Sequence, residues 1–131
     1  MGRLRGEAPL LKTITIAGAG PAGLAAAIHL RRSGVPVAVF ERRDAVGARF
    51  IGEWQLLESY SRRVDALEEL RAMGIEPTFE HIPATWAHLL DDRGKKLEVR
   101  SKAPYGYFLR RGVEEGTLDR SLESQAKALG A

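Results

Sequence analysis

Two apolar runs of strand length flank an alanine- and leucine-rich segment near the start of the chain. The runs lie at about residues 12–17 and 35–40, and the segment between them, at about residues 21–33, has the composition of a helix. Gly34 directly follows that segment and is a typical helix stop. The pattern therefore predicts a strand, a helix and a second, parallel strand, which together make a βαβ unit.

The apolar pattern changes after this unit. Residues 42–60 show no regular period, which predicts a long loop. From Ser61 onwards apolar residues recur at three-residue steps as far as Met73, which predicts an amphipathic helix that Ser61 caps and Gly74 ends.

The rest of the chain predicts short strands and one more helix. Turn residues at 91–94 lie between two of the strands and indicate a β-hairpin. The expected strands are residues 78–82, 85–90, 97–101 and 105–111, and the expected helix is residues 117–129. The fold class is therefore α/β, with a Rossmann-like dinucleotide-binding βαβ unit and a small antiparallel hairpin in one thin sheet.

The turn between the first strand and the first helix carries the candidate chemistry. Residues 18–23 read Gly-Ala-Gly-Pro-Ala-Gly. Gly18 allows a turn that a Cβ would obstruct, Gly20 clears space for a pyrophosphate, and Gly23 lets the helix pack closely on the strand. Pro21 suits the first helical turn. The free N–H groups and the dipole of the helix would then stabilise the two phosphates. The open alternative is a βαβ unit whose loop binds nothing.

An acidic residue ends the second apolar run. Glu41 lies 18 residues after Gly23, close to the spacing of about 20 expected for the acid that binds a ribose. A carboxylate there accepts hydrogen bonds from ribose hydroxyls and repels a 2′-phosphate. The site should prefer the ADP of FAD or NAD over that of NADP, although Arg42 and Arg43 weaken the exclusion. Arg49, in the long loop, either folds back onto this pocket or is solvated.

Length and composition limit the class of protein. The 131 residues suffice for one ordinary domain, and the absence of cysteine excludes disulfides and thiolate chemistry. Residues 1–11 are expected to be a loose leader without a signal-peptide pattern. There is no apolar run of about 18 residues, so we expect no membrane span and a cytoplasmic location. The three histidines lack metal-ligand spacing, so no metal is expected.

The positive charge is concentrated in the first half of the chain. The net charge is +3, with ten Lys or Arg against six Asp or Glu in residues 1–65. These basic residues are not interleaved with aromatic residues and no nucleic-acid motif is present, so the excess suits an anionic cofactor and nucleic-acid binding is not expected.

The last expected helix is not followed by a strand. Parallel sheets normally carry helices on both faces, and the predicted sheet is thin. We therefore expect residues 1–131 to be the N-terminal portion of an incomplete FAD/NAD(P)-binding domain, without a substrate domain.

Four stretches together resemble the N-terminal part of FAD-dependent oxidoreductases of the p-hydroxybenzoate hydroxylase-like group, and more closely geranylgeranyl reductase-type flavoproteins. They cover nearly the whole chain, and the second, third and fourth stretches are more specific to this group than the first. The stretches are residues 18–23 with Glu41 and Arg42, residues 46–55, residues 107–111, and residues 117–119 leading into Leu122, Ala126 and Gly130.

The resemblance implies roles for individual residues. The three glycines would hold the FAD pyrophosphate, and Glu41 with Arg42 would bind the adenosine ribose. Arg49 would lie near the pyrophosphate and the ribityl chain, and Arg111 would meet the flavin side, with Arg110 as the fallback. The candidate cofactor-binding residues are thus Gly18, Gly20, Pro21, Ala22, Gly23, Glu41, Arg42, Arg49 and Arg111.

The resemblance also implies an activity. The chain would be the FAD-binding portion of an oxidoreductase that transfers hydride through flavin, with NAD(P)H as electron donor and an isoprenoid or aromatic small molecule as substrate. No residue is identified as a catalytic acid, base or nucleophile, and the group's later Gly-Asp motif and substrate sheet are not found in this sequence. Two alternatives stay open: a stand-alone dinucleotide-binding module without catalysis, and a fragment of an NAD-dependent dehydrogenase.

Overall fold

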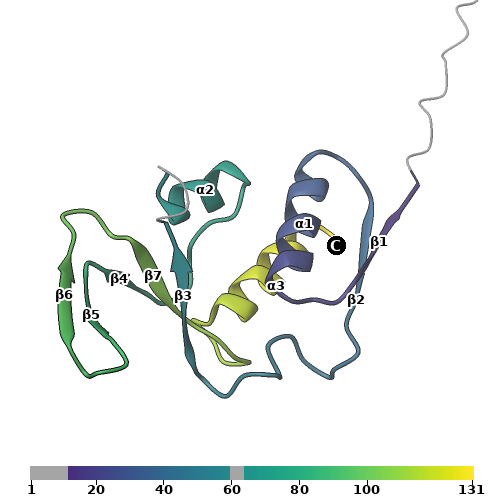
Figure 1. Ribbon diagram of the computed structural model, residues 1–131. Helices are drawn as coiled ribbons and strands as arrows, with labels where there is room; N and C mark the ends of the chain where they lie inside the picture. The colour runs from purple at the N-terminus through teal and green to yellow at the C-terminus, as the bar shows by residue number, and fades with distance from the viewer. Residues whose placement is uncertain (1–11, 60–63) are drawn as a thin grey trace, which may run out of the picture.

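The βαβ unit forms as predicted. The computed structural model describes residues 12–59 and 64–131, so the expected leader at residues 1–11 lies outside it. Strand β1 (Ile14–Ala17), helix α1 (Pro21–Arg32) and strand β2 (Val37–Phe40) follow one another, and the two strands pair in parallel (Figure 1). Gly34 adopts a φ of +78° just after the helix, a conformation that glycine favours, which explains why the helix stops there.

The strands form three separate sheets, so the expectation of one thin sheet is wrong. Strands β3 (Trp54–Glu58), β7 (Gly106–Arg110) and β4 (His81–Ala84) make an antiparallel sheet in the order β3-β7-β4. Strands β5 (Trp86–Leu90) and β6 (Lys96–Arg100) form the predicted hairpin. In Figure 1, α1 and α3 lie between the parallel pair and the antiparallel strands.

Two predictions between β2 and β4 are wrong. The stretch expected to be one long loop contains β3, which pairs with β7 about fifty residues away. Helix α2 (Ala66–Ala72) begins later than expected because Asp65 caps it: its carboxylate accepts from the backbone N–H of Leu67 at 2.9 Å. Ser61, the expected cap, lies outside the described residues.

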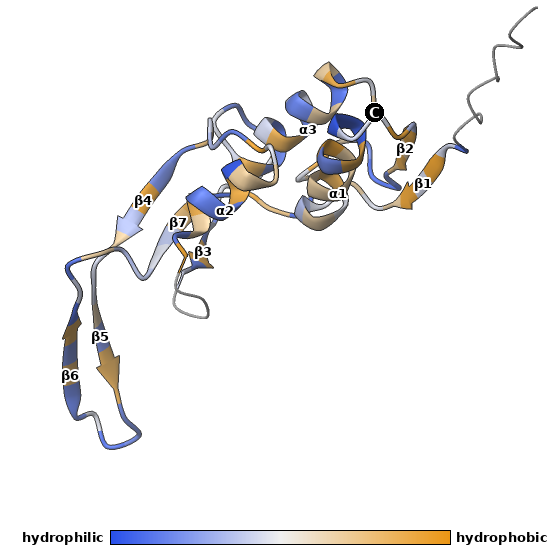
Figure 2. Ribbon diagram, turned by 90° about the horizontal axis from the view of Figure 1, so that it is seen from above, coloured by the Kyte–Doolittle hydropathy of each residue, from blue (hydrophilic) through white to orange (hydrophobic). Residues whose placement is uncertain are grey.

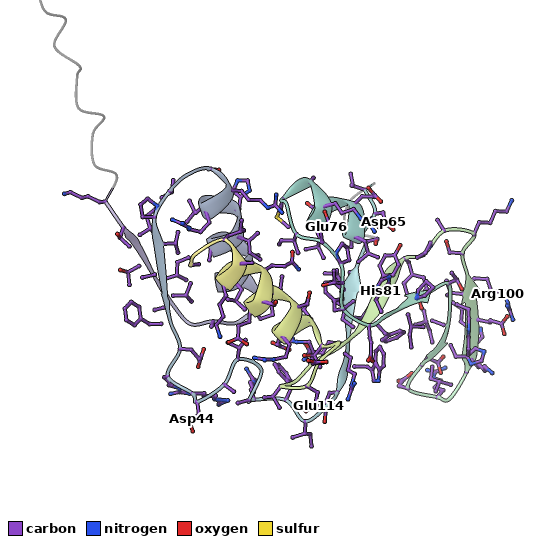
Figure 3. The ribbon with its side chains drawn as sticks, turned by 180° about the vertical axis from the view of Figure 1, so that it is seen from behind. Asp44, Asp65, Glu76, His81, Arg100 and Glu114 are labelled. Carbon is purple, nitrogen blue, oxygen red and sulfur yellow. The ribbon has the colours of Figure 1, made fainter. Side chains whose placement is uncertain are left out.

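Asp65 also connects this helix to the sheet. Tyr107 of β7 donates its hydroxyl to the Asp65 carboxylate at 2.5 Å, and Figure 3 shows Asp65 at the start of α2. This hydrogen bond, followed by burial, raises the pKa of Tyr107 to about 12. Burial alone would raise the pKa of Asp65, but the hydrogen bonds from Tyr107 and from the helix backbone outweigh it and lower that pKa.

The core lies where the two long helices meet the antiparallel sheet. Helix α3 (Leu118–Ala128) is capped by Thr117 and packs against α1. Ile28 of α1 is fully buried, and Leu122 of α3 and Leu109 of β7 are almost so. Such burial contributes about 25 cal/mol for each Å² of apolar surface removed from water. It therefore holds the βαβ unit and the antiparallel sheet in one arrangement.

The hairpin projects away from this core (Figure 2). One of its faces carries the opposed pair Leu89 and Leu97, both more than half exposed, and the other carries His88 opposite Glu98. The leucine face thus has no covering layer among the described residues. No described helix has the length and apolar character needed to cross a membrane.

Candidate functional site

An open cleft of about 940 Å³ lies at the carboxyl ends of β1 and β2. Ligands of open α/β sheets bind outside these strand ends, where the sheet and the following helix leave a crevice. Four parts of the chain line it: the glycine loop at residues 17–20 with Pro21, residues 40–43 at the end of β2, the loop containing residues 45–50, and the group Gln55, Arg111 and Asp119.

The three motif glycines occupy different environments. Gly18 has a φ of +99°, a turn conformation that a Cβ would disfavour through its own backbone, although no residue beyond its chain neighbours lies within 4 Å of that Cβ position. A Cβ on Gly23 would lie 2.1 Å from the carbonyl oxygen of Gly18 and 3.3 Å from the Ile16 side chain of β1, so this glycine permits the close packing of helix on strand that the sequence predicts. Gly20 has an ordinary φ of −74°, and its missing Cβ leaves open space on the cleft wall.

The start of α1 lies at the cleft and has no side-chain cap. Gly20 is the N-cap and supplies no side-chain hydrogen bond, Pro21 takes the first helical position, and the first turn has no acidic residue. The first N–H groups of a helix lack partners within the helix and attract anions. Ala22 and Gly23 lie in this first turn but outside the cleft lining, whereas Gly18, Gly20 and Pro21 belong to it.

Glu41 lies on the same cleft and faces the glycine loop. One carboxylate oxygen accepts from the N–H of Ala19 at 2.9 Å, and the other accepts from the N–H of Arg43 at 3.0 Å. The hydrogen bond from Arg43, followed by that from Ala19, lowers the pKa of Glu41, so the group is a fixed carboxylate at neutral pH. The structure thereby brings the predicted ribose acid and the predicted phosphate loop together.

Three arginines add positive charge to the cleft. Arg42, Arg43 and Arg49 line it, are exposed, and form no ion pair with any described residue. They follow β2 in the loop that carries Asp44 (Figure 3). The two predicted residues Arg42 and Arg49 are therefore placed where an anionic ligand would meet them.

Arg111 lies on the opposite wall of the cleft and, unlike these three arginines, has its charge paired. It is buried, and its Nε and Nη2 donate to the two carboxylate oxygens of Asp119, each at 2.8 Å. Its Nη1 donates to Gln55, and its guanidinium lies 4.0 Å from the centroid of the Phe50 ring. The predicted residue is thus present at the cleft, with its charge paired.

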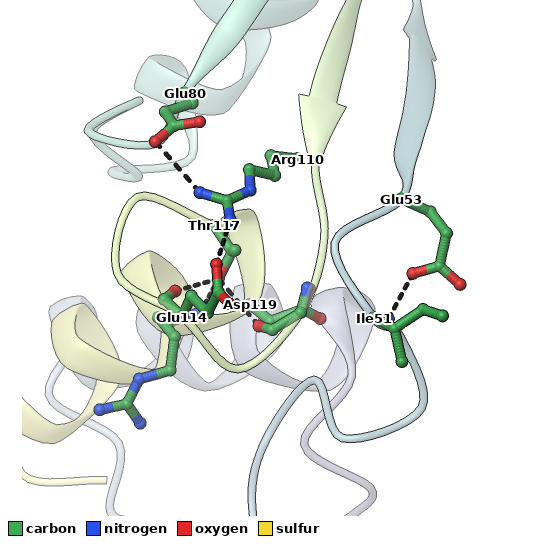
Figure 4. Close-up of polar contacts among 9 residues, drawn as sticks. Ile51, Glu53, Glu80, Arg110, Glu114, Thr117 and Asp119 are labelled. Carbon is green, nitrogen blue, oxygen red and sulfur yellow. Dashed lines mark hydrogen bonds and ion pairs between the residues drawn. The ribbon is translucent and has the colours of Figure 1, made fainter.

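The fallback, Arg110, faces elsewhere. Its guanidinium contacts Glu80 at 3.4 Å and also pairs with Glu114, and neither partner belongs to the cleft lining (Figure 4). Side chains alternate in direction along β7 and into the turn that follows it. Of the two neighbouring arginines, only Arg111 therefore faces the cleft.

Sequence reasoning missed three side chains on this wall. Phe50, Gln55 and Asp119 line the cleft, and none was assigned a role. Asp119 had a detectable signal: it falls three residues before Leu122 and seven before Ala126, on the apolar face of the last helix. An acid on a buried helix face needs a cationic partner, and Arg111 supplies it. No comparable signal pointed to Phe50 or Gln55.

Comparisons with known proteins agree with this architecture. A family model described as an NAD(P)-binding Rossmann-like domain matches residues 16–53. Among curated proteins, the chain is 40% identical over 68 residues to the glutamate synthase [NADPH] small chain of Mycobacterium tuberculosis, which covers 50% of this chain and 14% of that protein.

Solved structures match over most of this chain. It superposes on 2-methyl-3-hydroxypyridine-5-carboxylic acid oxygenase with a TM-score of 0.64 and 27% identity, covering 93% of this chain and 30% of that one. For aklavinone-11 hydroxylase, solved with FAD and aklavinone, the TM-score is 0.51 and the identity 22%, covering 95% of this chain and 25% of that one.

These matches confirm two predictions. The fold class is α/β with a Rossmann-like dinucleotide-binding unit, and the chain shares its fold with part of an oxygenase and part of a hydroxylase that was solved with FAD. The chain spans about 30% of the length of the oxygenase and 14% of the length of the synthase subunit. None of these matches bears on the likeness to geranylgeranyl reductases, which stays a prediction.

Proposed function

We propose that this chain binds FAD by its ADP portion and forms the FAD-binding portion of a flavin-dependent oxidoreductase. One observation carries the proposal: Glu41 is held as a carboxylate against the N–H of Ala19, on the same cleft as the start of α1, which has no side-chain cap. An acceptor for ribose hydroxyls and donors for a diphosphate thus lie side by side, as the ADP portion of a dinucleotide requires.

The described residues suit such a cofactor. The open space beside Gly20 gives a diphosphate access to the backbone, and Gly18, Pro21, Ala22 and Gly23 shape the loop and first turn around it. Residues 42, 43 and 49 offset the negative charge of the phosphates. In this proposal Arg42 lies beside the ribose, and Arg49 contacts the pyrophosphate or the ribityl chain.

The whole protein would be of the monooxygenase type. Two solved structures that share this fold are an oxygenase and a hydroxylase, which favours a small aromatic substrate over an isoprenoid. NAD(P)H as electron donor is suggested by the name of the matching family model. Bound flavin would supply the hydride transfer, and this chain would bind and orient it. In this proposal residues 1–131 are the N-terminal portion of the FAD-binding domain of a cytoplasmic protein, and a substrate domain lies elsewhere.

A second candidate is binding of NAD. The family model and the glutamate synthase subunit are both named for nicotinamide dinucleotides, and Glu41 suits the ribose of NAD equally well. The loop of residues 45–50, folded along the cleft with Arg49 exposed, favours FAD because it extends the binding surface beyond an ADP portion.

The test is a titration of the purified chain with FAD, NAD and NADP. We expect flavin absorbance to remain with the protein after gel filtration, FAD to bind more tightly than NAD, and NADP to bind most weakly because Glu41 repels its 2′-phosphate. Binding of NAD without FAD would instead support the dehydrogenase alternative. Bound flavin that NAD(P)H does not reduce would support either a fragment or a module without catalysis. If none of the three dinucleotides binds, the proposal is refuted.

A further inference from the structure

We propose that Arg111 is a positioning residue, which holds the loop of residues 45–50 as a wall of the cleft and leaves the electrostatic contact with the cofactor phosphates to Arg49. The inference rests on the proposed function for the identity of the ligand. It differs from the expected role of Arg111, which was a direct contact with the flavin side of FAD.

The charge of Arg111 is already compensated. Its side chain is 8% exposed, and the Asp119 side chain that it contacts at two points is 2% exposed. Asp119 also accepts from the N–H of Gly112 at 3.0 Å, so both of its oxygens are occupied. A two-point contact fixes the orientation of the guanidinium as well as its charge. A phosphate approaching this wall therefore meets a neutral pair.

The same pair supports both ends of a short turn in the loop. Phe50 lies against the guanidinium at 4.0 Å, and its N–H donates to the carbonyl of Gly47 at 2.9 Å. A Cβ on Gly47 would lie 2.8 Å from the Cβ of Asp119 and 2.4 Å from the carbonyl oxygen of Gly112. The turn from Gly47 to Phe50 is thus packed directly on the ion pair, so moving the pair would move the turn.

Arg49 lies within this turn and has the opposite properties. It is exposed on the cleft, forms no ion pair with any described residue, and lies 5.7 Å from the centroid of the Phe50 ring. Its full charge faces the cleft from a backbone that Arg111 holds in place. The two arginines therefore have different roles: buried Arg111 positions the loop, and exposed Arg49 provides the charge that faces the cleft.

The decisive variant is Arg111→Lys, which keeps the charge but loses the planar fork that makes the two-point contact and lies against the ring. The first readout needs no ligand: trypsin cleavage after Arg49, with cleavage after Arg93 in the hairpin turn as internal control. We expect Arg111→Lys to accelerate the first cleavage about tenfold, the factor expected when a hydrogen bond to a charged group is lost. Phe50→Leu should accelerate it about threefold, the scale of a lost cation–π contact, and neither variant should change the second cleavage.

The second readout is the dissociation constant of FAD as a function of salt concentration. We expect Arg111→Lys to weaken binding with the salt dependence of the wild type, and Arg49→Gln to weaken binding with a flatter salt dependence, because of these two arginines only Arg49 contributes an exposed charge that salt screens. Unchanged cleavage in both Arg111→Lys and Phe50→Leu would overturn the proposal, as would a flatter salt dependence in Arg111→Lys.

The outcomes separate this inference from the proposed function. If the wild type binds no FAD, the proposed function fails, while the cleavage assay still decides whether Arg111 holds the turn. If Arg111→Lys does not fold, Phe50→Leu decides instead, because it removes the ring without touching the ion pair. Faster cleavage after Arg49 in that variant supports the proposal, and cleavage at the wild-type rate refutes it.

Discussion

The glycine loop permits a test that separates binding from folding, through the substitution Gly20→Val. The backbone of Gly20, at φ −74° and ψ 174°, suits a valine, and a Cβ there would meet no heavy atom within 4 Å. The change should therefore cost no more than about 1 kcal/mol of folding free energy, the scale of an altered N-cap. The valine would instead occupy the space through which we propose that a diphosphate reaches the start of α1.

The expected loss of affinity follows from the donors that become inaccessible. Two hydrogen bonds from backbone N–H groups to a charged diphosphate contribute roughly 3–6 kcal/mol together, which corresponds to a weakening of at least about 100-fold. FAD binding is measured by fluorescence titration, and folding by thermal unfolding of the same preparation. Gly20→Ala should give an intermediate affinity, because it fills less of the same space.

Gly23→Ala is the matched control. Its Cβ would lie 2.1 Å from the backbone oxygen of Gly18, which no rotamer change can relieve. Even after a gain of about 1 kcal/mol in helix propensity, we expect a net destabilisation of about 2 kcal/mol or more. Gly20→Val should thus lose FAD binding with little loss of folding stability, whereas Gly23→Ala should lose folding stability. FAD binding by Gly20→Val at the wild-type level would refute the assignment of the phosphate site.

Three further predictions concern other parts of the structure. Glu41→Gln should weaken FAD binding about tenfold and reduce the discrimination against NADP, measured by parallel titrations; because the pKa of Glu41 is lowered, wild-type affinity should stay flat with pH until the pH falls below the usual value of 4.5. Tyr107→Phe should cost about 1–2 kcal/mol in denaturant unfolding at pH 8 by removing the hydrogen bond to Asp65. Above pH 10 the unfolded state loses the tyrosine proton first, so the wild type should lose this advantage as the pH rises towards 12, and the variant should not. Gly47→Ala should lower the unfolding temperature, because its φ is +80° and its Cβ would lie 2.4 Å from the oxygen of Gly112; an unchanged temperature would contradict the packing of this turn.

The elements that could be predicted are those whose causes lie close together in the sequence. The βαβ unit follows from two apolar runs, one helical segment and the glycines between them. The hairpin follows from the turn at residues 91–94, where the Asp91 side chain accepts from the N–H groups of Arg93 and Lys95. The start of the last helix likewise follows from Thr117, whose side chain caps it.

The wrong predictions concern features whose causes lie far apart in the sequence. The stretch 42–60 lacks a strand pattern, yet Trp54 to Glu58 form β3 because β7 offers them a partner, with Trp54 opposite Arg110. The amphipathic helix starts later than its sequence predicts because Asp65 caps it, and the contact of Asp65 with Tyr107, 42 residues away, holds this cap in place. Propensity is a weak prior that such contacts override.

The candidate site is divided in the same way. The sequence by itself determined the glycine loop and the acid that contacts it, because the conformations of Gly18 and Gly20 and the position of Glu41 at a strand end depend on neighbouring residues and one crossover. Only the tertiary structure decided the opposite wall. Burial of Asp119 on the core face of α3 draws Arg111 into an ion pair and away from solvent, and leaves Arg49 as the exposed charge. An unpaired buried charge is costly, and that cost exists only once the chain has folded around it.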